Sequence, residues 1–161
     1  MHLFGSGSVL QQALHAQSSL AACNIAADVW SATSYNELYR DAIACERWNR
    51  LHPQSEPRVP YLQRCLDGEE GVFVAVSDYM KALPNCIAPW IPGRYIVLGT
   101  DGYGLSEARP ELRSYFEIDP AHITVASMYA LAQDGQIKFE QVEEAILRLG
   151  IDADKVDPAG Q

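Results

Sequence analysis

Four short strand-like segments, separated by longer stretches with helical periodicity, form the framework of this chain. They cover residues 2–4, 27–32, 72–76 and 95–98, and residues typical of turns follow each of them. The third segment, Val-Phe-Val-Ala-Val, is apolar at every position, which is typical of a strand buried on both faces of a sheet. Strands that alternate with helices predict an α/β domain with a mostly parallel sheet.

Helical periodicity accounts for most of the remaining chain. A helix is predicted after the first strand, and its apolar face is expected to carry Val9, Leu10, Ala13, Leu14 and Ala21. A longer helix is predicted to begin at Ser34, because a serine followed three residues later by Glu37 has the spacing of a capping box. This helix is expected to end near Trp48, and shorter helices are predicted at 61–66 and 79–83.

The last third of the chain is predicted to be helical. An aspartate–proline pair at 119–120 is typical of a helix start, and that helix is expected to end at Gly135. A final helix has an apolar stripe formed by Val142, Ala145, Ile146 and Leu149. Gly150 is expected to end it. Residues 1–150 are therefore predicted to form one domain, with a surface tail at 151–161.

A proline-rich segment at 52–60 interrupts the helices and is predicted to be an ordered surface connection. Three aromatic residues lie close to prolines in the sequence: Trp48 and Tyr61 at the two ends of this segment, and Trp90 after another proline. They form either an exposed apolar patch for a partner or the packing that holds the connection onto the core. The sequence leaves both interpretations open.

The charge balance argues against several classes of partner. The chain has 161 residues, with 12 Lys and Arg against 21 Asp and Glu, which gives a net charge of −9. An acidic chain without a basic run is unsuited to nucleic acid or to an anionic membrane surface. The longest apolar stretch, 87–92, is too short to span a bilayer. With no charged-then-apolar leader before the first strand, the expected location is the cytoplasm.

Two glycine-rich turns are the strongest candidates for a binding site. Gly5, Ser6 and Gly7 follow the first strand, and the backbone N–H groups of such a turn can bind an anion. A tight turn from strand into helix explains the same residues and is the favoured interpretation, because an α/β fold needs glycines where a strand reverses into a helix. The turn is not a P-loop, because no Lys-Ser or Lys-Thr pair follows, and Leu10 replaces the third glycine of a dinucleotide-binding turn.

The second glycine-rich turn follows the last predicted strand. Its candidate contact residues are Asp101, Gly102, Tyr103, Gly104, Ser106 and Arg109. Open α/β sheets usually bind ligands at the carboxyl ends of their strands, where this turn is expected to lie. A ligand site, a partner contact and a plain flexible turn remain open for it.

No catalytic, cofactor-binding or metal-ligating residue is assigned from the residues alone. The histidines are His2, His15, His52 and His122, and they have no metal-ligand spacing. No Gly-x-Ser-x-Gly elbow is present. The four cysteines are spaced 22, 20 and 21 residues apart, so the chain has no zinc-type Cys-x-x-Cys pair and reduced structural thiols are expected.

Several segments, taken in order, resemble one family. Residues 29–38, V-W-S-A-T-S-Y-N-E-L, resemble the D-V-[YW]-S-V-T-S-F-x-E-L segment of the homodimeric pyruvate dehydrogenase decarboxylase component. Further similar blocks are C-E-R-W-N at 45–49, L-H-P at 51–53, P-R-V-P-Y at 57–61, S-D-Y-M-K at 77–81, L-G-T-D-G at 98–102 and I-D-A-D-K-V at 151–156. Each block is modest alone, but their order over nearly the whole chain is highly specific.

The resemblance implies a fold and a place in a larger protein. The fold it implies is transketolase C-terminal-like: a three-layer α/β/α domain with a mixed, mostly parallel, five-stranded sheet. The place is the C-terminal domain of a three-domain chain that uses thiamin diphosphate and Mg to decarboxylate a 2-oxo acid and reductively acetylate lipoyl groups. The implied partners are the upstream domains of the same chain and the second subunit of a homodimer, with the dihydrolipoyl acyltransferase component as a further candidate.

The same resemblance implies that this domain binds no cofactor itself. The cofactor of the family lies between the two upstream domains, and this chain has no Gly-Asp-Gly and no Asn-Asn pair to hold it. The chain departs from the family at Tyr103, Leu105 and Glu107, so contacts of the second glycine-rich turn are expected to differ. The leading hypothesis is a dimer-assembly domain that is inactive alone. The alternative is a stand-alone binding module of the same fold for a small anion or a regulator.

Overall fold

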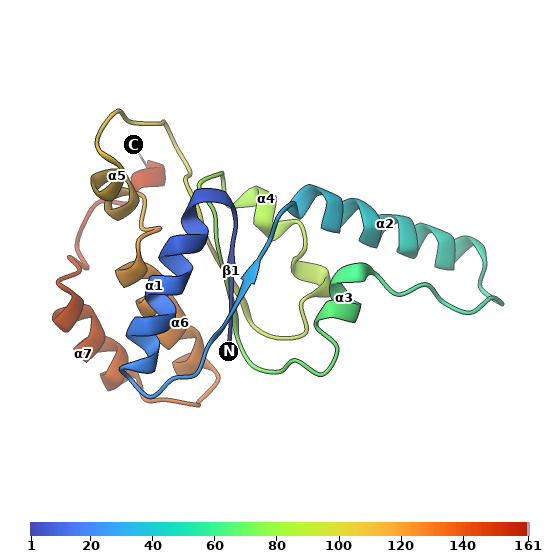
Figure 1. Ribbon diagram of the computed structural model, residues 1–161, viewed down its shortest axis with the longest axis horizontal. Coiled ribbons are helices and arrows are strands. Elements are labelled where there is room, and N and C mark those ends of the chain that lie inside the picture. The colour runs from blue at the N-terminus through green and yellow to red at the C-terminus, as the bar shows by residue number, and fades with distance from the viewer. Residues whose placement is uncertain (161) are drawn as a thin grey trace.

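A computed structural model describes residues 1–160 and shows a parallel sheet between two layers of helices (Figure 1). The strands are β1 (His2–Gly5), β2 (Asp28–Ser31), β3 (Phe73–Val76) and β4 (Tyr95–Leu98). They lie in the order β2-β1-β3-β4, and every neighbouring pair is parallel. The register places His2 beside Asp28 on one side and beside Phe73 on the other.

The strand count corrects the five-stranded, mixed sheet that the family resemblance implied. Within residues 1–160 the sheet has four strands and no antiparallel one. These four strands are the four strand-like segments of the sequence, and the chain after β4 passes into a glycine-rich loop and then into helices. The three-layer α/β/α architecture is confirmed.

Helices cover both faces of the sheet (Figure 1). One face carries α1 (Leu10–Ala21) and α6 (Pro120–Gln133), and α5 (Arg109–Tyr115) and α7 (Phe139–Leu149) lie on the same side. The other face carries α2 (Tyr35–Leu51), α3 (Tyr61–Cys65) and α4 (Ala82–Asn85). Three single-turn 3-10 helices are η1 (Gly7–Val9), η2 (Ala88–Trp90) and η3 (Pro158–Gly160).

Alternation along the central strands builds one core on each face. Leu3, Val74 and Val76 pack in the cluster that contains α1, α6 and α7 residues. Phe4, Phe73 and Ala75 pack in the cluster on the α2, α3 and α4 side. Full burial of a large apolar side chain contributes about 1.5–3 kcal/mol, so these central strands anchor both layers.

The buried face of α1 differs from the predicted one. Its core residues are Val9, Ala13, Ala16 and Leu20, whereas Leu14 is 37% exposed and Ala21 is also exposed. The buried set follows the i, i+4, i+7, i+11 spacing of one helix face. Leu14 lies one step further around the helix, so its side chain leaves that face.

Side-chain caps begin two of the helices as predicted. The Ser34 hydroxyl accepts the Glu37 backbone N–H at 3.2 Å, at the start of α2. The reciprocal half of that capping box is replaced, because the Glu37 carboxylate accepts a hydrogen bond from Arg40 at 2.8 Å. Asp119 caps α6 by accepting the His122 backbone N–H at 2.9 Å.

Helix α2 runs three residues beyond its predicted end near Trp48 and carries the chain away from the sheet (Figure 1). Residues 43–60, the far part of α2 and the returning proline-rich segment, form a projection that we call the arm. Within α2 only Tyr35 and Ala42 are buried, and both lie before the arm. Of the three aromatic residues near the prolines, Trp90 is packed at 7% exposure whereas Tyr61 is 54% exposed.

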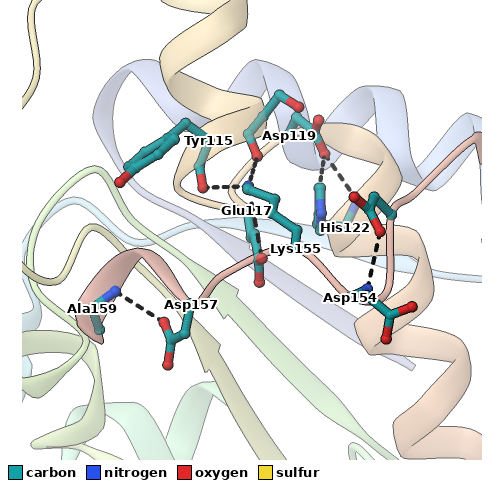
Figure 2. Close-up of polar contacts among 10 residues, drawn as sticks. Tyr115, Glu117, Asp119, His122, Asp154, Lys155, Asp157 and Ala159 are labelled. Atoms are coloured by element: carbon teal, nitrogen blue, oxygen red, sulfur yellow. Dashed lines mark hydrogen bonds and ion pairs between the residues drawn. The ribbon is translucent and has the colours of Figure 1, made fainter. Parts of the chain in front are cut away.

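Residues 151–160 pack against α5 and the chain that follows it (Figure 2). The Lys155 ammonium group donates to the carbonyls of Ser114 at 2.9 Å and Tyr115 at 2.6 Å, and lies 3.8 Å from the Glu117 carboxylate. These carbonyls belong to the last turn of α5, where a cation is electrostatically favoured.

The domain boundary at residue 150 stays a prediction. No helix within residues 1–160 has both the length and the apolar composition to cross a membrane.

Candidate functional site

Three loops meet at the carboxyl edge of the sheet, after β1, β3 and β4. Because all the strands are parallel, their carboxyl ends lie at one edge, where α/β sheets usually bind ligands. The hydroxyl of Ser6 donates to the hydroxyl of Ser77 at 3.3 Å, and the hydroxyl of Ser8 donates to the Asp78 carboxylate at 3.1 Å. The first glycine-rich turn is therefore tied to the loop after β3.

The first turn contains a glycine that its geometry requires. A Cβ atom at Gly5 would lie 2.7 Å from the Cα atom of Leu10, a separation that real side chains do not adopt. The side chain of Ser6 is engaged with Ser77, and Gly7 opens the 3-10 turn that leads into α1. These contacts support the interpretation of the turn as a tight strand-to-helix connection.

The second turn is held by contacts within the fold. The Asp101 carboxylate accepts the backbone N–H of Lys81 at 2.9 Å and lies 3.7 Å from the Lys81 ammonium group. Gly102 has a φ of +89°, and a Cβ atom there would lie 2.9 Å from the carbonyl oxygen of Pro158. Asp101 thus holds the loop to Lys81, and Gly102 allows the C-terminal segment to approach it closely.

A groove of about 460 Å³ lies beside these loops and α5. Its polar lining includes Ser8, Asp78, Thr100, Arg109 and Arg113, and its apolar lining includes Leu105, Leu112, Phe116 and Ile118. The Arg109 side chain is exposed and forms no hydrogen bond or ion pair within residues 1–160. Arg113 donates only a long bond of 3.5 Å to the Ser8 carbonyl. Two guanidinium groups beside apolar side chains suit a small anion with an apolar part.

The structure brings together only part of the predicted residue set. Gly104 and Arg109 line the groove, whereas Tyr103 is 84% exposed and Ser106, also exposed, lies outside the lining. Sequence reasoning missed Asp78 and Arg113. The position of Asp78 directly after a buried strand was the available signal, because that position predicts the carboxyl edge.

The groups that line the groove are suited to binding. No histidine or cysteine is among its lining residues. The Ser8 hydroxyl donates to a carboxylate and has no imidazole to remove its proton. The arginines and apolar side chains of the groove can therefore contribute to recognition of a small anion.

A second polar cluster, at the amino edge of the sheet, has a structural explanation. His2, Asp28 and Glu69 place potential metal-ligand atoms within 4.8 Å of one another. The Trp30 ring N–H donates to Nδ1 of His2 at 3.3 Å, so the neutral ring carries its proton on Nε2, which donates to the Glu70 carbonyl at 3.1 Å. Both ring nitrogens are thus used in hydrogen bonds, which account for the cluster without a metal ion.

An aspartate–histidine pair starts α6, beside the Lys155 contacts (Figure 2). The Asp119 carboxylate accepts both the His122 backbone N–H at 2.9 Å and the His122 ring Nδ1–H at 2.7 Å. Burial raises the pKa of Asp119, but the hydrogen bonds from His122 outweigh it and lower that pKa below its usual value. Asp119 serves the helix start, and a capping role for His122 agrees with this geometry.

Three bacterial proteins that share one name are similar to this chain. A Pyruvate dehydrogenase E1 component from Pseudomonas aeruginosa is 45% identical over 160 residues, which are 98% of this chain and 18% of that protein. The protein of the same name from Escherichia coli is 43% identical over 98% of this chain and 18% of its own length. The one from Mycobacterium tuberculosis is 47% identical over 84% of this chain and 15% of its own length.

The chain thus spans less than a fifth of the length of these relatives. The family described as the transketolase-like TK C-terminal domain matches residues 1–119, which contain all four strands and α1 to α5. Helices α6 and α7 lie beyond that match, although they share the buried cluster of α1. On this match and this fold, the chain belongs to the family of transketolase-like C-terminal domains.

Proposed function

We propose that this chain acts as the structural, dimer-assembly domain of a pyruvate-dehydrogenase-type decarboxylase and is not catalytic alone. The observation that carries the proposal is the extent of the similarity. Relatives named Pyruvate dehydrogenase E1 component match 98% of this chain at 43–45% identity, including the helices beyond the family match, while the chain covers only 18% of each. A stretch that is similar throughout is expected to keep the role it has in the longer proteins.

The groups around the carboxyl-edge groove agree with a non-catalytic role. A thiamin diphosphate site needs carboxylate and amide oxygens for the metal ion that holds the diphosphate. The carboxylate of Asp101, in the second glycine-rich turn, is already hydrogen-bonded and ion-paired with Lys81, and no asparagine lines the groove. These residues do not fit the cofactor, so no step of the reaction is assigned to this chain.

The proposed partners follow from the proposed place. The upstream domains of the same chain would cover part of its surface, and a second subunit would complete a homodimer. Thiamin diphosphate and Mg would be bound by those upstream domains, in the cytoplasm. The dihydrolipoyl acyltransferase component is a further partner of the complete enzyme.

A chimera tests this function. The matching C-terminal stretch of the Escherichia coli relative is replaced by residues 1–161 of this chain, and pyruvate-dependent turnover and dimer formation are measured. We expect a dimeric chimera that decarboxylates pyruvate. A matched control carries Phe73→Asp, which places a charge in the fully buried cluster of one sheet face and is expected to abolish both properties. A folded chimera that stays monomeric would contradict the assembly role, and a dimeric chimera without turnover would contradict the place in a pyruvate decarboxylase. Full turnover of the relative with the stretch deleted would contradict both.

A second candidate function, a stand-alone anion-binding module, is favoured by the two arginines of the carboxyl-edge groove. Its test is the thermal stability of the chain in inorganic phosphate at constant ionic strength. This function predicts stabilisation that is lost in Arg109→Ala and kept in Arg47→Ala, a matched removal of an exposed arginine far along the chain. Equal behaviour of the two variants would count against it.

A further inference from the structure

The arm presents exposed apolar side chains on a framework that is ordered by its own contacts. Leu51 is 56% exposed, Val59 is 51% exposed and Ile43 is 40% exposed. Exposed apolar surface of this kind marks an interaction site where it is contiguous. The arm projects from the rest of the domain (Figure 1), and its own domain leaves these three side chains exposed.

Hydrogen bonds and ring contacts hold the two halves of the arm together. The Asn49 side chain donates to the Arg58 carbonyl at 2.9 Å and accepts the Arg58 backbone N–H at 2.7 Å. The Arg58 guanidinium lies 4.3 Å from the centre of the Trp48 ring, and the His52 ring stacks on the same tryptophan at 4.5 Å. A surface that is already ordered loses little conformational entropy when it binds.

Charge is unevenly distributed between the end of the arm and the rest of the chain. Residues 47–58 contain Arg47, Arg50 and Arg58 and one acidic residue, Glu56, although the whole chain carries −9. We call these three arginines the tip. Within residues 1–160, neither the Arg47 nor the Arg50 side chain forms a hydrogen bond or an ion pair. The tip therefore presents two unpaired guanidinium groups to the surroundings of the arm, where an acidic surface would complement them.

An acidic groove lies where the arm joins the body. It has a volume of about 800 Å³, and we call it the base groove. Its lining includes the acidic residues Asp67, Glu69 and Glu70 and the apolar residues Val59, Trp90 and Pro92. The Glu69 carboxylate lies 3.6 Å from Nε2 of His2, whereas the carboxylates of Asp67 and Glu70 form no hydrogen bond or ion pair in the described part of the chain. Arg64 also lines the groove, with its guanidinium 5.8 Å from the Tyr61 ring.

We propose that two copies of this chain pair through their arms, antiparallel, with the tip of each copy on the base groove of the other. A two-fold axis makes an interface self-complementary, so one basic end and one acidic end per copy supply two opposite-charge contacts. A parallel pairing would bring the two tips together and is disfavoured by repulsion. The pairing rests on the assembly role proposed above and assigns that role to a particular surface.

Charge reversal followed by mixing tests the pairing. The full chain is studied by sedimentation as the wild type, Arg50→Glu, Glu70→Arg and the double variant. We expect each single reversal to weaken self-association about tenfold, because two like-charge contacts replace two attractive ones. The double variant is expected to recover wild-type association. An equimolar mixture of the two single variants is expected to form heterodimers, since both of its contacts then join opposite charges.

A matched control and the contrary results make the test decisive. Glu143→Arg changes the net charge as Glu70→Arg does, on an exposed position of α7, and is expected to leave association unchanged. Circular dichroism verifies that each variant is folded. A wild type that stays monomeric up to about 1 mM, single reversals without effect, or a mixture that fails to associate would each overturn the pairing. Sedimentation measures self-association of the chain itself, whereas turnover is measured on the chimera. A failure of the pairing can therefore be told apart from a failure of the decarboxylase role.

Discussion

One buried tyrosine hydroxyl makes no hydrogen bond in residues 1–160. The Tyr35 side chain lies in the core between β1 and α2, and its hydroxyl oxygen has no partner. Burial, with a further contribution from Cys86, raises the pKa of Tyr35, so the hydroxyl stays protonated at physiological pH. Because no hydrogen bond compensates the desolvation of this hydroxyl, we expect Tyr35→Phe to raise the free energy of unfolding in urea by about 1 kcal/mol.

Tyr95 is the matched control for this prediction. Its hydroxyl donates to the Pro84 carbonyl at 3.0 Å in the same core. Removing that hydroxyl in Tyr95→Phe leaves the carbonyl without its donor and should cost about 1 kcal/mol. Destabilisation of similar size in both variants would show that Tyr35 has a partner after all.

The Asp119–His122 pair makes the start of α6 sensitive to acid. The pKa of Asp119 is lowered in the folded chain, so the unfolded chain takes up a proton first as the pH falls. The contribution of the charge to stability is full above the unfolded pKa, near 3.8, and disappears as the pH falls through the lowered folded pKa.

Asp119→Asn keeps an acceptor at the cap and removes the charge. We expect it to cost about 1 kcal/mol at neutral pH, because hydrogen bonds to a charged acceptor are stronger. Unfolding free energies measured from neutral to acid pH should converge for the variant and the wild type. A difference that is independent of pH would assign the cost to packing instead.

At the scale of elements, the sequence pattern predicted the strands better than the helices. The segment 95–98 is β4 without change, and 72–76 differs from β3 by one residue. The apolar face of α1 was placed wrongly because Leu14 and Ala21 match the hydrophobic composition of the helix but not the phase set by Val9 and Leu20. Helix α5 was missed, because it follows a glycine-rich loop and buries no residue fully.

The C-terminal end of α7 gives the prediction at this scale. Gly150 adopts a φ of +68°, in the left-handed region, and ends the helix as the sequence pattern indicated. Gly150→Ala is expected to destabilise the fold by about 1 kcal/mol, because a Cβ atom disfavours this backbone conformation. Gly104→Ala is the control, since its φ is not in that region and no atom lies within 4 Å of the new Cβ. Equal unfolding midpoints for the two variants would contradict the prediction.

At the scale of the whole molecule, the sequence pattern predicted the layers of the fold but not the arm that projects from them. Tyr61 and Trp90 are both aromatic residues that follow a proline in the sequence, yet Tyr61 is exposed and Trp90 is packed. Sequence periodicity does not tell whether another element covers such a side chain. The candidate site was predicted in part for a related reason. The turn after β4 was located, but Asp78 and Arg113 join it only through the folded arrangement of β3 and α5. The arm and its base groove could likewise be recognised only in the folded structure.

The central claim is that this stretch works as part of a larger decarboxylase chain. An immunoblot of the cells that produce it, with an antibody raised against this chain, tests that claim most directly. The account predicts one band several times larger than 17.8 kDa, because the chain spans 15–18% of its relatives. A single band at 17.8 kDa would contradict the account and favour a free-standing binding module.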